Sequence, residues 1–153
     1  MYIDIIKSKC EPSFSIFLQA FIQIDWAMKW LQMKYRESQN EWFGKKGLPW
    51  HLTHVIRTKQ LSINLPSVKL FEHRTFCHVF NYCGQTGRTV VSILRDVLTR
   101  LRSENPKLDK VYVRADNAGC YHGSEFLLSV QQLYEETGVL IRRIDFSEAQ
   151  AGK

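Results

Sequence analysis

Apolar residues recur at three- and four-residue intervals between Arg88 and Glu104, which is the period of an amphipathic helix. Arg95, Arg100 and Arg102 lie off this stripe. The stripe itself consists of Val90, Ile93, Leu94, Val97, Leu98 and Leu101. The residue before a proline rarely stays helical, so the helix is predicted to end at the Asn105-Pro106 pair.

A second helix is predicted from Ser124, as its N-cap, to Glu136. Gly138 follows, and a glycine in this position commonly ends a helix because it adopts the left-handed conformation at no steric cost. For the first helix, Thr86 or Thr89 supplies the predicted cap. Both helices therefore have defined starts and ends.

Alternating and β-rich apolar segments predict the strands of a sheet. The five predicted strands are Ala20–Lys29, Pro49–Lys59, Val68–Tyr82, Lys110–Ala115 and Val139–Ile144. Residues 32–47 form a predicted loop or short helix, residues 60–66 a turn, and residues 116–123 a loop rich in Asn and Gly.

Three strands in succession predict an antiparallel meander, and the helix-linked strands after them predict parallel crossovers. The expected fold class is therefore α/β, with a mixed five-stranded sheet and helices on its faces. This order matches the ribonuclease-H-like fold. We expect a poorly defined lead-in over residues 1–19 and one domain over residues 20–153.

Composition narrows the class of protein further. Lys and Arg number 21 against 15 for Asp and Glu, giving a net charge of +6 that favours a polyanionic partner such as nucleic acid. No apolar run approaches the roughly 18 to 20 residues of a membrane helix, and the N-terminus lacks a signal-peptide pattern. We therefore expect an intracellular protein without a membrane partner, nuclear if the source is eukaryotic, with its four cysteines reduced.

Two acids stand out as candidate metal ligands. Asp25 lies inside the apolar first strand, where an acid costs free energy unless it has a partner or a role. Asp116 follows directly on the fourth strand, which neighbours the first in the expected sheet. Two close carboxylates repel unless a cation bridges them, and such oxygen ligands suit Mg²⁺ or Mn²⁺. The alternative for Asp116 is a turn former, with Asn117 and Gly119.

The sequence around these acids resembles DDE transposases and retroviral-type integrases. The segment Arg114-Ala-Asp-Asn-Ala-Gly-Cys-Tyr-His-Gly-Ser-Glu-Phe is similar to the second-acid motif of those enzymes, and Ile24-Asp-Trp to the first-acid strand. The tail Ile144-Asp-Phe-Ser-Glu-Ala-Gln-Ala-Gly-Lys resembles the segment leading to the helix with the third acid. The resemblance implies a divergent, transposon-derived catalytic core, incomplete at its C-terminus.

This resemblance implies a metal-dependent polynucleotidyl transferase or nuclease that acts on DNA phosphodiesters. Asp25 and Asp116 would be catalytic and would hold Mg²⁺ or Mn²⁺. The third acid in the family lies about 35 residues after the second, which points to the end of this chain or just past it. Within the chain, Glu148 is the candidate for that role, slightly short of the spacing.

Four further residues are candidate nucleic-acid contacts. Lys45 and Lys46 lie in a loop between Trp42 and Trp50, where cations suit phosphates and indoles suit stacked bases. The alternative is a hairpin loop held by its aromatic residues. In the loop after the fourth strand, Asn117 and His122 are placed near the metal site, with His122 expected to touch phosphate.

Zinc and thiol chemistry are weaker alternatives. The cysteines and histidines, Cys77-His78, Cys83 and Cys120-Tyr-His122, match none of the usual zinc spacings. A Cys120–His122 nucleophile and base pair would need the fold to position the imidazole. His51 and His54 are three apart on a strand and are therefore predicted to face opposite sides.

Three functions thus remain open from sequence. The first is the active DNA-cutting or DNA-joining enzyme, as a possible homo-oligomer. The second is a domesticated or truncated relative that binds nucleic acid without turnover. The third is an unrelated α/β binding module with a basic face.

Overall fold

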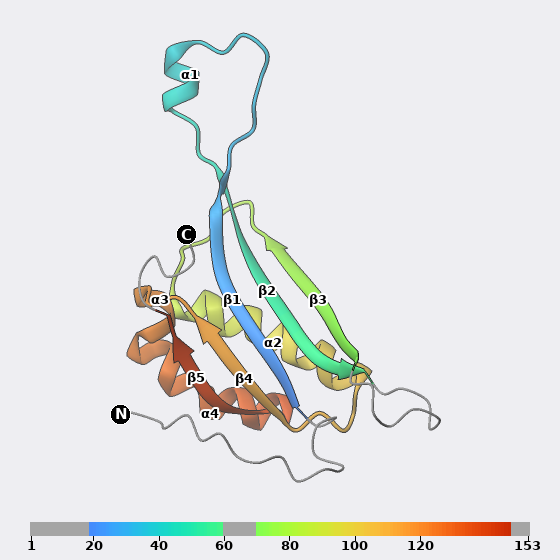
Figure 1. Ribbon diagram of the computed structural model, residues 1–153. Helices are drawn as coiled ribbons and strands as arrows, with labels where there is room; N and C mark the ends of the chain where they lie inside the picture. Colours follow the sequence, from blue (N-terminus) through green and yellow to red (C-terminus); the bar gives the residue numbers. More distant parts are fainter. Residues whose placement is uncertain (1–18, 60–69, 148–153) are drawn as a thin grey trace.

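The computed structural model describes residues 19–59 and 70–147 of the chain (Figure 1). The predicted lead-in lies outside this part except for Gln19, the first residue of the first strand. The elements in chain order are β1 (Gln19–Trp30), α1 (Gln39–Phe43), β2 (Leu48–Lys59), β3 (Leu70–Val79), α2 (Gly87–Glu104), β4 (Lys110–Ala115), α3 (Gly119–His122), α4 (Ser124–Thr137) and β5 (Leu140–Phe146).

The five strands form one mixed sheet in the order β3-β2-β1-β4-β5. β1 pairs with β2, and β2 with β3, in antiparallel fashion, whereas β4 pairs in parallel with both β1 and β5. The predicted α/β class and the division into an antiparallel meander and parallel crossovers are confirmed. β1 is the central strand, and it joins the two halves of the sheet.

The long helices α2 and α4 pack together over one face of this sheet (Figure 1). The whole predicted stripe of α2 is buried, and it meets the inward side chains of the strands. Ile22 and Ile24 of β1, Val55 of β2 and Val113 of β4 are at most 1% exposed. Burial of apolar area at about 25 cal/mol per Å² makes this helix–sheet layer the main source of stability.

The opposite side of the sheet, called here the open face, carries the alternate residues of each strand. On β1 the buried Ile22 and Ile24 alternate with the exposed Gln23 and Asp25. His54 of β2 lies on the same side, since its neighbours Thr53 and Val55 point into the core. The open face is therefore mixed, with Leu52 and Ile56 beside His54 on β2 and with the Asp25 carboxylate on the central strand.

The helix ends are set largely as predicted. Thr86 caps α2 by accepting a hydrogen bond from the backbone N–H of Thr89. Gly138 ends α4 with a left-handed φ of 68°. One prediction was wrong: Gly123, not Ser124, is the N-cap of α4, and no side chain caps this helix. The preceding short helix α3 ends at Gly123 and supplies the turn that replaces a side-chain cap.

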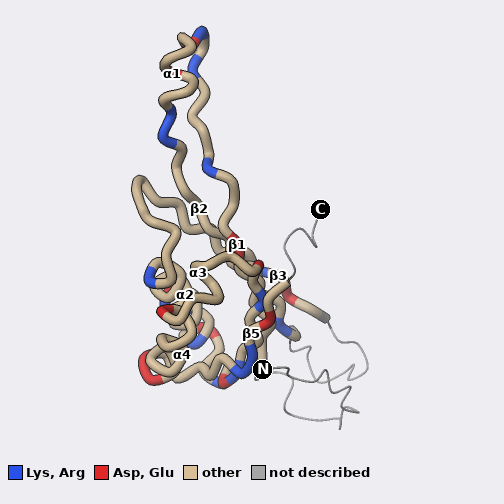
Figure 2. Tube along the Cα trace, turned by 90° about the vertical axis from the view of Figure 1, so that its left-hand side faces the viewer, with Lys and Arg blue, Asp and Glu red and all other residues tan. Residues whose placement is uncertain are grey.

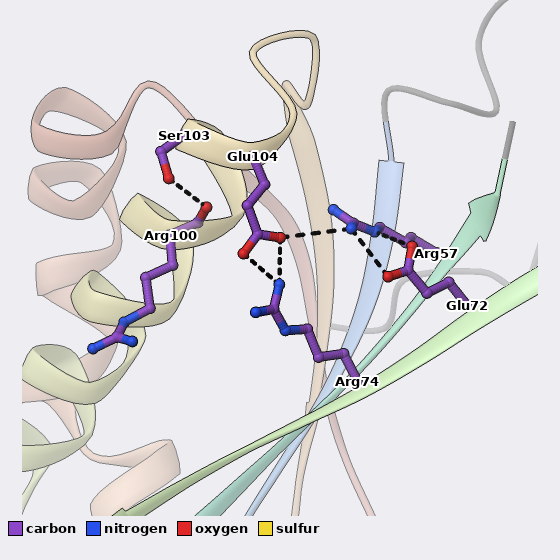
Figure 3. A network of polar contacts seen from close by, with 6 residues as sticks. All are labelled: Arg57, Glu72, Arg74, Arg100, Ser103 and Glu104. Carbon is purple, nitrogen blue, oxygen red and sulfur yellow. Dashed lines mark hydrogen bonds and ion pairs between the residues drawn. The ribbon is translucent and has the colours of Figure 1, made fainter.

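A network of charged side chains ties the C-terminal end of α2 to the antiparallel half of the sheet (Figure 3). Arg57 of β2 donates to both carboxylate oxygens of Glu72 on β3, at 2.9 and 3.2 Å. Glu104 at the end of α2 accepts from Arg74 and lies 3.6 Å from Arg57. Linked ion pairs hold geometry better than isolated ones, so this network fixes where α2 crosses β2 and β3.

Strands β1 and β2 continue beyond the rest of the sheet as a two-stranded ribbon (Figure 1). β1 pairs with β4 only up to Gln23, but with β2 as far as Trp30. Residues 31–47, called here the arm, close the ribbon and include α1 (Figure 2). The predicted loop or short helix of residues 32–47 is thus a loop that contains one short helix.

Among the described residues, no helix has both the length and the apolar character needed to cross a membrane.

Candidate active site

Asp25 lies on β1, and Asp116 directly follows the last residue of the neighbouring parallel strand β4. Gln23 of β1 pairs with Arg114 of β4, and each aspartate lies two residues further along the chain. Side chains two residues apart on a strand share a face, and extending this register by two residues puts both carboxylates on the open face. The repulsion of Asp25 by Asp116 agrees with their proximity. Both residues are exposed. A cation in solvent can therefore reach the pair.

The two carboxylates also interact electrostatically. The pKa of Asp25 is raised above its ordinary value, first because partial burial disfavours the charged form and second because Asp116 repels it. A hydrogen bond from the backbone of Trp26 acts in the opposite direction but is the smallest of the three effects. A divalent cation between the carboxylates would remove the repulsion and favour both ionised forms.

The loop after β4 fixes the position of Asp116. Its Oδ1 accepts a hydrogen bond of 3.0 Å from the backbone N–H of Ala118, which forms a tight turn two residues on. The turn-former alternative is therefore present in the structure. Only one carboxylate oxygen is used in this bond, so the second oxygen is left for another ligand.

Asp116 also lines a hollow of about 610 Å³ between the start of α2 and the α3 loop. Asp25 does not line it, although its neighbour Trp26 does. The lining residues are Trp26, Gln85, Thr86, Gly87, Asp116, Ala118, Gly119, Cys120 and Tyr121. The lining is therefore mixed, with the rings of Trp26 and Tyr121 beside small and polar residues. The backbone N–H of Arg88, next to Gly87 in α2, donates to Glu125.

Three rings lie on the core side of the sheet next to the aspartates: His51 and Tyr121 are buried, and Trp26 is partly buried. Trp26 meets His51 edge to face at 5.0 Å between centroids, and Tyr121 lies 6.1 Å from His51 on a tilted plane. The Trp26 Nε1, His51 Nε2 and Tyr121 hydroxyl are buried without a hydrogen-bond partner in the described part of the chain. Burial lowers the pKa of His51 to about 4, with a smaller effect from His78, and raises the pKa of Tyr121. Both rings are therefore uncharged at neutral pH.

Two further predicted site residues, Asn117 and His122, lie beside or within α3. Asn117 is exposed directly after Asp116. His122 is exposed at the end of α3, and its ring packs edge-on against Phe146 of β5 at 6.4 Å between centroids. Glu148 lies outside the described residues. The carboxylate pair is thus the part of the predicted catalytic set that the structure brings together.

The two predicted lysine contacts of the arm differ in their surroundings. Lys45 forms an ion pair with Glu37, and its ammonium lies 4.7 Å from the centroid of the Trp42 ring. These contacts leave its side chain 13% exposed. Lys46 next to it is exposed. Within this loop the Trp42 ring contacts Lys45, and Lys46 is exposed to solvent.

Neither a zinc site built from the cysteines and histidines nor catalysis by a thiol gains support from the geometry. Within residues 19–59 and 70–147, no group of three or more His, Cys, Asp and Glu side chains is placed to hold a metal ion. Cys77, Cys83 and Cys120 are free thiols. Burial and the charge of Asp116 raise the pKa of Cys120, which is the reverse of what a thiolate nucleophile requires.

Sequence reasoning missed the contact of the Trp26 ring with His51 and of His51 with Tyr121. The alternation of β2 could have shown that His51 shares the core side with Thr53 and Val55. Nothing in the sequence signals that Tyr121 would reach the same place, because it lies in a segment predicted to be a loop. The separation of His51 and His54 onto opposite faces was predicted and is confirmed.

No protein-family model matches this sequence, and no curated protein matches it. The mixed sheet in the order β3-β2-β1-β4-β5 is consistent with a ribonuclease-H-like fold.

Proposed function

We propose that this chain is a metal-dependent polynucleotidyl transferase core that acts on DNA phosphodiesters, of the transposase or integrase type. The observation that carries the proposal is the juxtaposition of Asp25 on β1 with Asp116 at the end of the neighbouring strand β4, where burial first and the charge of Asp116 second raise the pKa of Asp25. Two neighbouring acids each disfavour the ionised form of the other, and a cation between them relieves this repulsion.

In this proposal the two aspartates hold Mg²⁺ or Mn²⁺ through carboxylate oxygens. Bound there, the cation would stabilise negative charge on the attacking and leaving oxygens of a phosphoryl transfer. Asp116 contributes the oxygen that is not used by Ala118, and the turn keeps this carboxylate beside β1. Glu148 is the proposed third acid, and the attacking group is water or a 3′-hydroxyl.

The charge of the arm supports DNA as the substrate. The arm contains the cations Lys34, Arg36, Lys45 and Lys46 against the acids Glu37 and Glu41. It also exposes aromatic rings, with Tyr35 at 89% and Phe43 at 80%. Cations with exposed rings suit a phosphate backbone and unpaired bases. We assign phosphate contact to Lys46, with Asn117 and His122 contacting the strand near the aspartates.

The test is cleavage of labelled DNA by the chain in Mg²⁺ or Mn²⁺. Asp25→Asn and Asp116→Asn are each expected to abolish cleavage, because an amide loses the charge that holds the cation. The matched control is Glu135→Gln on α4, where the exposed carboxylate accepts from Gln131 of the same helix. Cleavage by both aspartate variants at the rate of the control would overturn the assignment.

The second candidate is a nucleic-acid-binding relative without turnover. It is favoured by the absence of a third acid beside Asp25 and Asp116 among the described residues. In that case the chain binds DNA with the salt dependence of a basic surface, yet it shows no cleavage in either metal. Glu148→Gln separates the two, since it abolishes cleavage only if Glu148 completes the site.

A further inference from the structure

A second pair of side chains meets on the open face, on strands that do not carry the aspartates. His54 of β2 and His73 of β3 approach each other with His54 Nε2 at 3.2 Å from His73 Nδ1. Their ring centroids are 5.4 Å apart and their planes are inclined by 32°. In this contact one ring nitrogen donates its N–H and the other accepts it, according to the tautomers of the two rings. Each nitrogen is a potential metal ligand once it carries no proton.

The pairing of β2 with β3 explains why the rings meet. His54 pairs with Thr75, and Ile56, two residues on, pairs with His73. The two histidines are therefore diagonal neighbours on one face, within reach of each other's rings. A regular ten-pair ladder between the strands holds their backbones, so the approach does not depend on a loop.

Thr75 orients the ring of His54. Its hydroxyl lies 2.9 Å from His54 Nδ1, which fixes the ring so that Nε2 is directed at His73. Histidines that bind metals typically have their other ring nitrogen held in this way by a hydrogen-bond partner. Thr75 lies on β3, as His73 does, so the pairing of β2 with β3 positions both the second histidine and the residue that orients the first.

The spacing of the two nitrogens suits a shared cation. With metal–nitrogen bonds of 2.0 to 2.1 Å and tetrahedral angles, two imidazole ligands lie roughly 3.3 Å apart. The observed separation of 3.2 Å needs little movement to reach this value. His73 and Thr75 are exposed and His54 is partly exposed, so solvent can supply the remaining ligands.

We propose that His54 and His73 form a binding site for a divalent transition-metal cation of the Zn²⁺, Ni²⁺ and Cu²⁺ group, with Thr75 as the positioning residue. Imidazole pairs favour these ions, whereas carboxylates favour Mg²⁺ and Mn²⁺. The site is therefore chemically distinct from the Asp25–Asp116 pair and does not depend on the proposed function. A bound ion would also cross-link β2 to β3.

The test is a calorimetric titration of the whole chain with Ni²⁺, repeated with Zn²⁺, in excess Mg²⁺. We expect binding to one site, with perturbation of two histidine rings in NMR spectra. His54→Gln and His73→Gln are each expected to remove this binding. Thr75→Val keeps the strand and both ligands but loses the orienting bond, so about tenfold weaker binding is expected.

The sequence offers matched controls, because it contains five histidines in all. His78 and His122 are not part of the His54–His73 pair, so the variants His78→Gln and His122→Gln are expected to bind Ni²⁺ like the parent chain. Asp25→Asn is expected to bind it equally, which separates this site from the aspartates. Retained binding of Ni²⁺ by His73→Gln would overturn the proposal. Loss of binding in Cys77→Ser would then place the ion at that thiol. Circular dichroism of each variant shows whether it is folded.

Discussion

The indole of Trp26 meets the imidazole of His51 edge to face, with centroids 5.0 Å apart and planes inclined by 82°. Tyr121 lies 6.1 Å away from the same imidazole. His51 is fully buried, and its Nε2 has no hydrogen-bond partner in the described part of the chain. A proton on this ring would be a charge enclosed by aromatic surface, which explains the low pKa of about 4.

This environment predicts acid sensitivity. The unfolded chain protonates His51 near its ordinary pKa of 6.5, whereas the folded chain resists protonation down to about 4. The stabilising effect of an uncharged His51 is therefore complete above pH 6.5 and is lost as the pH falls towards 4. The loss amounts to no more than about 3 kcal/mol. Urea denaturation at pH 7 and pH 5 measures it.

The control for this prediction removes the titrating group. His51→Leu keeps an apolar side chain in the core, and its free energy of unfolding should fall less between pH 7 and pH 5 than that of the parent chain. His122→Gln, at an exposed position, should keep the parent's pH dependence. An identical pH dependence in His51→Leu and the parent chain would contradict the assignment.

Removing one carboxylate of the aspartate pair is expected to stabilise the fold but to weaken cation binding. At pH 7, without divalent cations, Asp116→Asn is expected to raise the free energy of unfolding by roughly 0.2 to 1 kcal/mol, because it removes a repulsion from Asp25. Asn retains the Oδ1 that accepts from Ala118. The gain should disappear at low pH, where Asp25 is protonated. In Mn²⁺ the parent chain should have the higher free energy of unfolding of the two, since only the parent chain is stabilised by the ion.

Urea titrations of both chains with and without Mn²⁺ measure this effect. Equal stabilisation of the parent chain and Asp116→Asn by Mn²⁺ would show that the ion binds elsewhere.

Leu94 lies at the centre of the α2 stripe and is fully buried against the sheet. Leu94→Ala is expected to lower the free energy of unfolding by about 2 to 5 kcal/mol, because it removes apolar contacts and leaves a cavity. Leu128→Ala is the control: this leucine of α4 is 80% exposed, so a change within about 0.5 kcal/mol is expected. Similar denaturation midpoints for the two variants would contradict the described packing.

The arm predicts a salt-dependent contribution to DNA binding. Lys46→Gln should weaken binding alike for all sequences and reduce the slope of log K against log salt by about 1. Lys107→Gln, an exposed lysine between α2 and β4, is the control and should leave the slope unchanged. Fluorescence anisotropy over a range of salt concentrations measures both. If Lys46→Gln leaves the slope of log K against log salt unchanged, Lys46 does not contact phosphate and the proposed role of the arm in DNA binding is contradicted.

The sheet could be predicted because its signals are local. Alternation located the strands, the 3.6-residue period located α2, and Gly138 ended α4 with the expected left-handed backbone. The cap of α4 could not be predicted, because it depends on α3, a helix of one turn without a periodic signal. The extents of β1 and β2 were predicted to within one residue at each end, but the sequence does not show that β4 pairs with β1 only up to Gln23 and leaves the rest of β1 paired with β2 as a ribbon.

The candidate site was only partly predictable for the same reason. The place of Asp25 on β1 and of Asp116 after β4 followed from strand order, and the observed register agrees with their juxtaposition. The contact of His54 with His73 depends on which residue of β3 pairs with which residue of β2, and alternation alone does not set that register. Glu148 remains a prediction, because it lies outside the described residues.

The central place of β1 has a consequence for how the protein folds. Its antiparallel edge finds β2 nearby in the chain, so this hairpin can form early. Its parallel edge receives β4 only after α2 has been made and has crossed the sheet. During synthesis that edge stays unpaired while its apolar side chains are already arranged in a strand, and an unpaired edge recruits strands from other molecules. Slow closure by β4 should therefore make aggregation during refolding depend steeply on protein concentration.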